Sequence, residues 1–168
     1  IVMYSLNIST GRYITIDLEK GDTRRANQIF NTNLVITLLL ISAVIPVGAV
    51  LIIFVPSIFT IPSGREQDVQ ILFIGVITAF LLSTYRINYS LATFARNRFD
   101  LRNLVALGGR ITQVLIILTL FSLKEPKLIY VGLGAVGAAL FNLVGDYYLW
   151  LLLLPALKVN WREFSKKL

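Results

Sequence analysis

Four long apolar segments alternate with short polar connections along the chain. Each segment has at least about 20 residues, the length of helix that crosses a hydrocarbon core of about 30 Å. Membrane barrel strands would instead alternate over about 10 residues, so the pattern predicts helices. The predicted spans are 34–59, 69–95, 104–123 and 128–157, and 1–16 has the composition of a fifth, truncated span. We therefore expect an all-α, polytopic helical bundle forming a single membrane domain over 1–168.

The polar connections carry turn signals. Gly21 followed by Asp22 predicts a helix stop and then an N-cap. Pro46 lies within 34–59 and predicts a kink or a freed carbonyl, serving either as a flexing point or as a static bend. The expected cytoplasmic connections are the loops 12–30 and 96–103 and the tail 158–168, and the opposite turns are 60–68 and 124–127.

Composition supports a lipid-facing protein. Hydrophobic residues make up 56% of the chain and charged residues 15%, whereas soluble domains have about 45–50% and about 25%. Cysteine and histidine are both absent from the sequence, which excludes thiolate nucleophiles, Cys/His zinc sites and histidine acid–base catalysis. We interpret Asp17, Glu19 and Asp22 as a solvated face without catalytic pairing. We expect neither an enzyme nor a bound cofactor.

Positive charge is distributed unevenly among the connections. Of 16 Lys and Arg residues, eleven fall in 12–30, 96–103 and 158–168, three fall in the other two connections, and two lie inside spans. Cytoplasmic loops of membrane proteins carry an excess of Lys and Arg. This asymmetry places the first group in the cytoplasm and accounts for the net charge of +7 without a nucleic-acid partner.

Arg86, Arg110 and Asp146 lie within apolar spans. A charge at the centre of a membrane helix costs roughly 2.5–3.5 kcal/mol on insertion scales, so such residues face the protein interior or a cavity. With a rise of 1.5 Å per residue, all three lie about 16–18 Å from the expected cytoplasmic ends of their helices. The sequence thus predicts three charges near the midplane on three different helices.

Polar neighbours follow the same helical faces. Asn103, Arg110 and Gln113 share a face of one helix, and Asn142 lies one turn before Asp146 on another. A polar stripe runs along the span 69–95 and continues two residues beyond it. Its members follow one another at spacings of 3, 4, 3 and 4 and are Ser83, Arg86, Ser90, Thr93 and Asn97. Two interpretations remain open. The arginines line a cavity for an anionic ligand such as a phosphate, or one of them pairs with Asp146 and pins helices together.

The segment Gly132-Leu-Gly134-Ala-Val-Gly137 matches the GxGxxG pattern of dinucleotide-binding proteins. That pattern requires a strand before the glycines and a helix after them. Here the glycines lie inside one long apolar segment, with small residues continuing to Ala139. We predict that they allow close helix packing, for example through Gly134 and Ala138.

Two polar connections resemble a known family. Gly11-Arg12-Tyr13-Ile14-Thr15-Ile16, Lys20-Gly21-Asp22 and Ala26–Thr32 resemble the segment that enters the third helix of polysaccharide transporters. Asn97–Leu101 resembles the loop between their fourth and fifth helices. That family belongs to the multidrug/oligosaccharidyl-lipid/polysaccharide exporter superfamily and includes O-antigen flippases, which serve lipopolysaccharide synthesis. The resemblance covers essentially the whole chain.

The resemblance implies a specific role and setting. The chain would correspond to the end of helix 2 through helix 6, most of the N-terminal lobe of a MATE-like two-lobe transporter of the bacterial inner membrane. Helix 1 and the C-terminal lobe would be missing. The implied partner is a lipid-linked (polyprenyl pyrophosphate) oligosaccharide, surrounded by membrane lipids. The implied binding residues are Arg86 and Arg110 for phosphate, with Asp146, Asn142, Gln113 and Ser90 orienting the arginines or bonding sugar hydroxyls.

Three other classes are weighed against the flippase. A cation-coupled multidrug antiporter of the same superfamily would use Asp146 as its ion site, although two midplane arginines disfavour cationic cargo. A membrane glycosyltransferase or polymerase would need a large external loop, and the longest expected one has about nine residues, 60–68. A non-transporting scaffold would leave the internal charges as an unexplained cost.

Overall fold

The computed structural model describes residues 2–61 and 64–160, which form a bundle of five helices without strands in that part of the chain. The helices are α1 (Val2–Glu19), α2 (Thr23–Ile58), α3 (Glu66–Ala95), α4 (Phe99–Leu123) and α5 (Ile129–Leu153). Of the helices described, four are long and apolar enough to cross a membrane, α2 to α5. The predicted all-α membrane fold is confirmed at this level.

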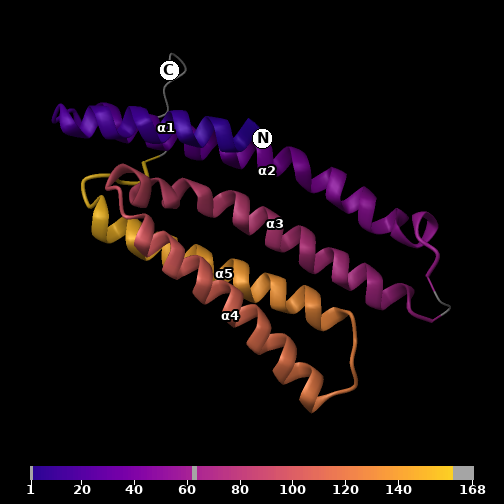
Figure 1. Ribbon diagram of the computed structural model, residues 1–168. Helices are drawn as coiled ribbons and strands as arrows, with labels where there is room; N and C mark the ends of the chain where they lie inside the picture. Colours follow the sequence, from indigo (N-terminus) through magenta and orange to yellow (C-terminus); the bar gives the residue numbers. More distant parts are fainter. Residues whose placement is uncertain (1, 62–63, 161–168) are drawn as a thin grey trace.

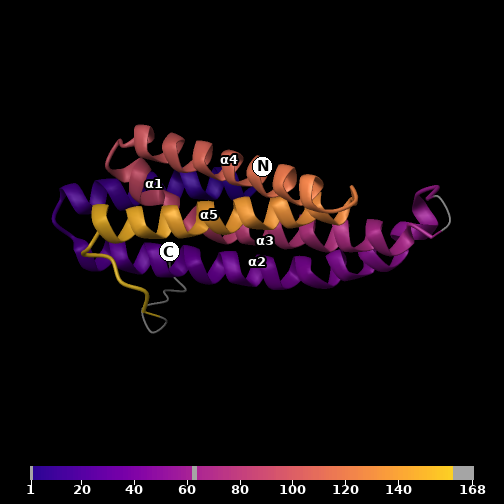
Figure 2. The ribbon, with the colours of Figure 1, turned by 90° about the horizontal axis from the view of Figure 1, so that it is seen from below.

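The helices run up and down along one long axis (Figure 1). The α1–α2 turn, the α3–α4 turn and the end of α5 gather at one end of the bundle, here called the basic end because the basic segments 12–30 and 96–103 meet there. The α2–α3 and α4–α5 turns lie at the other end. Helix α3 is central and contacts all four others, whereas α4 packs mainly on α5 (Figure 2).

Large apolar side chains cover much of the outer surface of the bundle. Leu39, Ile53, Leu115 and Val144 each expose more than half of their area. A soluble protein of this size would bury such residues, because apolar surface in contact with water is unfavourable. In a bilayer the same surface contacts lipid tails, so the arrangement agrees with the hydropathy of the helices.

The predicted turn chemistry is confirmed at the first connection. Gly21 has a φ of 77°, a left-handed conformation that glycine adopts without strain. The Asp22 side chain then accepts a hydrogen bond of 3.0 Å from the backbone N–H of Arg25, which caps the first turn of α2.

The connections at the basic end are shorter than the sequence indicated. Residues 12–30 form the end of α1 and the start of α2, with only 20–22 between the helices, and 96–103 contracts to 96–98. The reason is amphipathicity. Most polar residues of 12–30 lie on the outer faces of two helices whose inner faces carry Ile14, Ala26 and Phe30, all fully buried. Helix therefore continues beyond the apolar segments. Asp17, expected on a solvated face, is instead buried and pairs with Arg25 at 3.6 Å.

Helix α5 ends at Leu153, four residues before the predicted end of the last span at 157. Pro155 explains this difference, because a proline disfavours the helical conformation of the residue before it. Leu154 and Leu157 nevertheless point into the core and are 2% exposed.

The segment that follows α5 is held against α2 by two asparagines one helical turn apart. Asn27 Oδ1 accepts a 2.7 Å hydrogen bond from the Lys158 N–H. Asn31 donates to the Lys158 carbonyl at 2.9 Å and accepts from the Asn160 N–H at 2.7 Å. Of the predicted tail 158–168, residues 161–168 lie outside the described part of the chain.

Pro46 lies inside α2, which continues through it as one helix to Ile58. Its missing N–H leaves the carbonyl of Ser42 without its usual helical donor. This local change is accommodated without breaking the helix.

The predicted close packing of the small residues in α5 is confirmed. A Cβ atom on Gly75 of α3 would lie 2.7 Å from the Cα of Gly132, so the two backbones touch at this point. On another face of α5, a Cβ on Gly134 would meet Ile117 of α4 at 2.8 Å. The glycines lie within an unbroken helix, and the strand that dinucleotide binding requires is replaced by helix.

Candidate functional site

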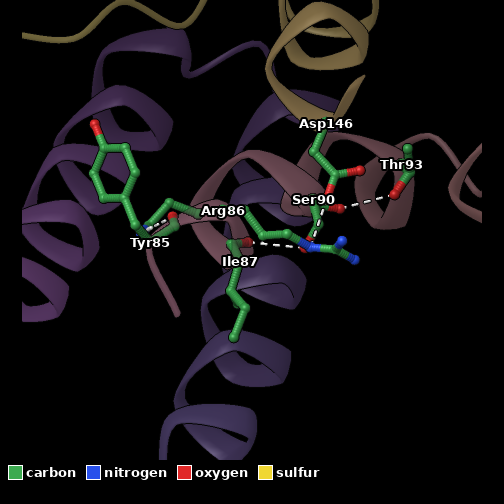
Figure 3. Close-up of polar contacts among 7 residues, drawn as sticks. Tyr85, Arg86, Ile87, Ser90, Thr93 and Asp146 are labelled. Carbon is green, nitrogen blue, oxygen red and sulfur yellow. Dashed lines mark hydrogen bonds and ion pairs between the residues drawn. The ribbon is translucent and has the colours of Figure 1, made fainter. Parts of the chain in front are cut away.

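The ion pair between Arg86 and Asp146 joins α3 to α5 (Figure 3). Arg86 Nε lies 3.2 Å from Asp146 Oδ2, and the side chains are 17% and 0% exposed. A buried carboxylate without a cation would be strongly unfavourable. The structure thus realises the interpretation in which one arginine pairs with Asp146 and links two helices.

This pair lies closer to the basic end than the sequence indicated. Arg86 is nine residues before the end of α3 and Asp146 seven before the end of α5, or about 14 and 10 Å at 1.5 Å per residue. The predicted 16–18 Å assumed that the last span continued to 157 and measured the depth of Arg86 from Arg98. The end of α3 at Ala95 and the early end of α5 before Pro155 account for the difference.

Ser90 and Thr93 belong to the polar stripe and lie beside the ion pair (Figure 3). Ser90 Oγ donates a 2.9 Å hydrogen bond to the carbonyl of Ile87, and Thr93 Oγ1 donates a 2.8 Å bond to the carbonyl of Ser90. Thr93 is fully buried and Ser90 is 8% exposed. These hydroxyl protons are satisfied by their own helix, so much of the stripe is packed inside the bundle.

Arg110 is arranged differently from Arg86. Its side chain on α4 is exposed, and it forms no ion pair or hydrogen bond within 2–61 and 64–160. Its neighbour Gly109 packs directly against Asn142, one turn before Asp146. Arg110 therefore lies at about the level of Asn142, one turn from Asp146. Its side chain is exposed and does not face the interior of the described bundle, contrary to the expectation for a charge within a span, and it remains an uncompensated cation there.

The other two predicted site residues lie along the contact between α4 and α5. Asn142 is half-buried against Gly109, and its Oδ1 has no hydrogen-bond partner among the described residues. Gln113 is half-buried, and its backbone carbonyl lies beside Gly134. The structure thus brings Arg86, Asp146 and Ser90 together, and places Arg110, Gln113 and Asn142 on or against α4.

A buried polar network joins α1, α2 and α3, and it was not predicted. Thr10 donates to Asn33 at 3.3 Å, Asn33 donates to Asn88 at 2.8 Å, and Thr37 donates to the same Asn88 oxygen at 3.1 Å. Asn88 within an apolar segment and Asn33 at the start of another were the available signal, but neither shares a helical face with the charged residues on which the sequence analysis centred. The network orders the helices and leaves few polar atoms for a ligand.

A cleft of about 340 Å³ was also not predicted. It lies between α1, α3 and α4 near the basic end, and Arg12, Ser90 and Arg102 contribute its polar groups. The sequence indicated only that both arginines belong to cytoplasmic connections. Because those connections are largely helical, the arginines are held on defined helical faces.

Metal binding finds no support in the described residues, which contain no group of three or more Asp or Glu side chains placed to hold an ion. The four carboxylates in ion pairs there each face an arginine. The site is therefore dominated by positive charge.

Comparison with known proteins gives one informative relative. The chain is 20% identical over 165 residues to a protein of Bacillus subtilis (strain 168) described as an uncharacterized membrane protein, EpsK. The match covers 98% of this chain and 33% of that relative, so the chain spans about a third of the relative's length. No family model matches the chain, and no solved structure matches it.

The protein is a multi-pass membrane protein. Four helices able to span a bilayer, the apolar outer surface and a membrane-protein relative all agree on this point.

Proposed function

We propose that this chain is part of a transporter that flips lipid-linked oligosaccharides across the bacterial inner membrane. The observation that carries the proposal is Arg110, an exposed cation on a membrane-spanning helix with no compensating acid among the described residues. A cation at such a position is costly unless an anion or water meets it. A pyrophosphate group would supply the anion, and arginine binds phosphate oxygens in a bidentate manner.

The roles of the site residues follow from their contacts. Arg86 is balanced by Asp146, so Arg110 is the primary phosphate ligand and the ion pair holds α3 and α5 in place. Asn142, with a buried oxygen that lacks a donor among the described residues, and Gln113 are candidates to orient a sugar hydroxyl. Ser90, whose hydroxyl donates to the carbonyl of Ile87, lies beside the pair on the same helix and is assigned no direct contact with the phosphate. No covalent step is involved, so we propose a transporter and not an enzyme.

Two further observations support the transport proposal. The loop segments around Gly21 and Asn97 resemble those of polysaccharide transporters, and both form tight turns at the basic end. The relative EpsK is about three times as long as the match, as expected if a second lobe completes the transporter. Two lobes would rock around the charged site while the lipid tail stays in the bilayer. The 168 residues alone are then expected to be inactive.

A cation-coupled antiporter is less well supported. Its ion site would be Asp146, which is already neutralised by Arg86 at 3.2 Å. An arginine in contact with the carboxylate opposes the binding of a second cation.

The test uses the full-length parent gene in a flippase-deficient strain, with surface polysaccharide as the readout. Arg110→Gln should reduce export at least about tenfold, the loss expected for one charge-assisted phosphate contact. Arg110→Lys should retain part of the activity because the charge remains. Lys124→Gln, which removes one positive charge just beyond the same helix, is the matched control and should export normally. Normal export by Arg110→Gln, at normal protein levels, would contradict the proposal.

A further inference from the structure

The cleft at the basic end combines two arginines with apolar walls. Arg12 of α1 and Arg102 of α4 flank it, and Ser90 lies on its α3 side. Its volume of about 340 Å³ falls at the lower end of the range of about 300–1,000 Å³ for small-molecule sites. It is therefore large enough for a phosphate group with a few attached carbons.

The charge in this cleft is not balanced by the protein. Neither arginine side chain forms an ion pair or hydrogen bond in the part of the chain that the structure describes. Asp100, two residues before Arg102, pairs with Arg98 at 2.9 Å, and the buried Asp146 pairs with Arg86 at 3.2 Å. The cleft thus offers a net positive charge to an anion.

Apolar side chains form the remaining walls. Phe94 and Phe99 lie edge to face, with ring centroids 6.0 Å apart, at the turn between α3 and α4. The aliphatic part of the wall comprises Ile8, Ile87 and Leu91. A free inorganic anion would gain nothing from these surfaces, whereas the chain of a lipid would cover them and remove them from water.

The position of the cleft also suits a lipid headgroup. Arg102 lies in the first turn of α4, and Arg12 lies seven residues before the end of α1, about 10 Å along the helix axis. Both are at the end of the bundle where Lys and Arg accumulate, which the positive-inside rule assigns to the cytoplasmic leaflet. Anionic headgroups occupy that level of the membrane.

We propose that this cleft binds the phosphate of an anionic lipid, with Arg12 and Arg102 on the phosphate and the lipid chain against Phe94 and Phe99. The site is separate from Arg110 and goes beyond the proposed transport. It holds a phosphate-bearing lipid at the cytoplasmic edge whether or not that lipid is exported.

Binding is tested on the purified full-length protein in neutral detergent by isothermal titration calorimetry. The probe is dioctanoyl phosphatidic acid, compared with inorganic phosphate and with zwitterionic dioctanoyl phosphatidylcholine. The double variant Arg12→Gln/Arg102→Gln should bind the phosphatidic acid at least about tenfold more weakly, because two charge-assisted contacts are lost. The variant Arg12→Lys/Arg102→Lys keeps both charges and should retain part of the affinity. It serves as a control for loss of binding caused by misfolding.

The matched control is Lys20→Gln/Arg24→Gln, which removes the same charge from exposed positions at the same end, outside the cleft. This pair should change the affinity by less than about twofold, as expected for exposed charges screened by salt. Unchanged binding by the cleft variant, or an equal loss in the control, would overturn the proposal. Inorganic phosphate binding as tightly as the lipid would assign the cleft to a free anion instead. Because export is not measured here, failure of this site leaves the Arg110 proposal intact.

Discussion

Asp146 is a fully buried carboxylate within an apolar helix. Arg86 is its one ion-pair partner among the described residues. Ionised groups in such surroundings persist only when a counter-charge is held in place. The pair therefore fixes the rotation of α5 relative to α3 as well as satisfying the charge.

At this scale we predict that Asp146→Leu destabilises the protein by about 3 kcal/mol or more, because it leaves the Arg86 guanidinium without a counter-ion. The double variant Arg86→Met/Asp146→Leu should recover most of the loss, since apolar replacement of a whole buried pair is often neutral. The measurement is the thermal unfolding midpoint of the full-length protein in detergent. A double variant as unstable as the single one would show that the pair contributes more than charge neutralisation.

At the level of elements, close contact between helices depends on where glycines, which have no side chain, lie along them. Helices α3 and α5 have the most extensive contact in the bundle, and Gly75 and Gly132 allow their backbones to touch. In membranes, such close approach replaces the hydrophobic effect as the source of helix association. The GxGxxG segment thus serves packing.

We predict that Gly75→Ala lowers the unfolding midpoint, although alanine favours helix by up to about 1 kcal/mol. Its Cβ would lie 2.7 Å from the backbone of Gly132, and overpacking of this kind costs about 1–3 kcal/mol. Gly48→Ala is the matched control. Its Cβ would meet a side-chain atom of Ile77 at 3.1 Å, and that side chain can move. An equal effect of both substitutions on the midpoint would contradict the backbone-contact explanation.

For the whole molecule, the distribution of charge sets the orientation in the membrane. The α1–α2 and α3–α4 turns and the end of α5 lie together at one end of the bundle (Figure 1). Of the eleven basic residues counted on this side in the sequence, the eight within the described part of the chain lie in these turns, in the adjoining turns of the helices or just after α5. The positive-inside rule therefore predicts that this end faces the cytoplasm.

Cysteine is absent from these 168 residues, so single introduced cysteines report their orientation in a full-length protein from which any other cysteine has been removed. In intact cells, a membrane-impermeant maleimide should label Lys124→Cys, which follows α4 at the opposite end. It should label Lys20→Cys, in the α1–α2 turn, only after the cells are permeabilised. Labelling in the reverse order would invert the topology and move the Arg12–Arg102 cleft to the outer leaflet.

The sequence by itself determined the membrane class and the helical bundle, because four apolar segments of bilayer length admit only helices. It also determined the Gly21–Asp22 cap and the packing role of Gly134, since both depend on local geometry. The ends of the helices were harder to predict from the sequence. The amphipathic continuation through 12–30 is stabilised by burial of Ile14 and Phe30, which only neighbouring helices provide.

The candidate site shows the same division between local and tertiary information. Spacing placed Arg86, Arg110 and Asp146 near one level, because rise per residue depends on the chain alone. Which arginine pairs with Asp146 depended on how α3, α4 and α5 rotate against one another, which is decided by the packing of the helices in the folded bundle. The Arg12–Arg102 cleft joins residues 90 positions apart, so only the tertiary structure could bring their charges together.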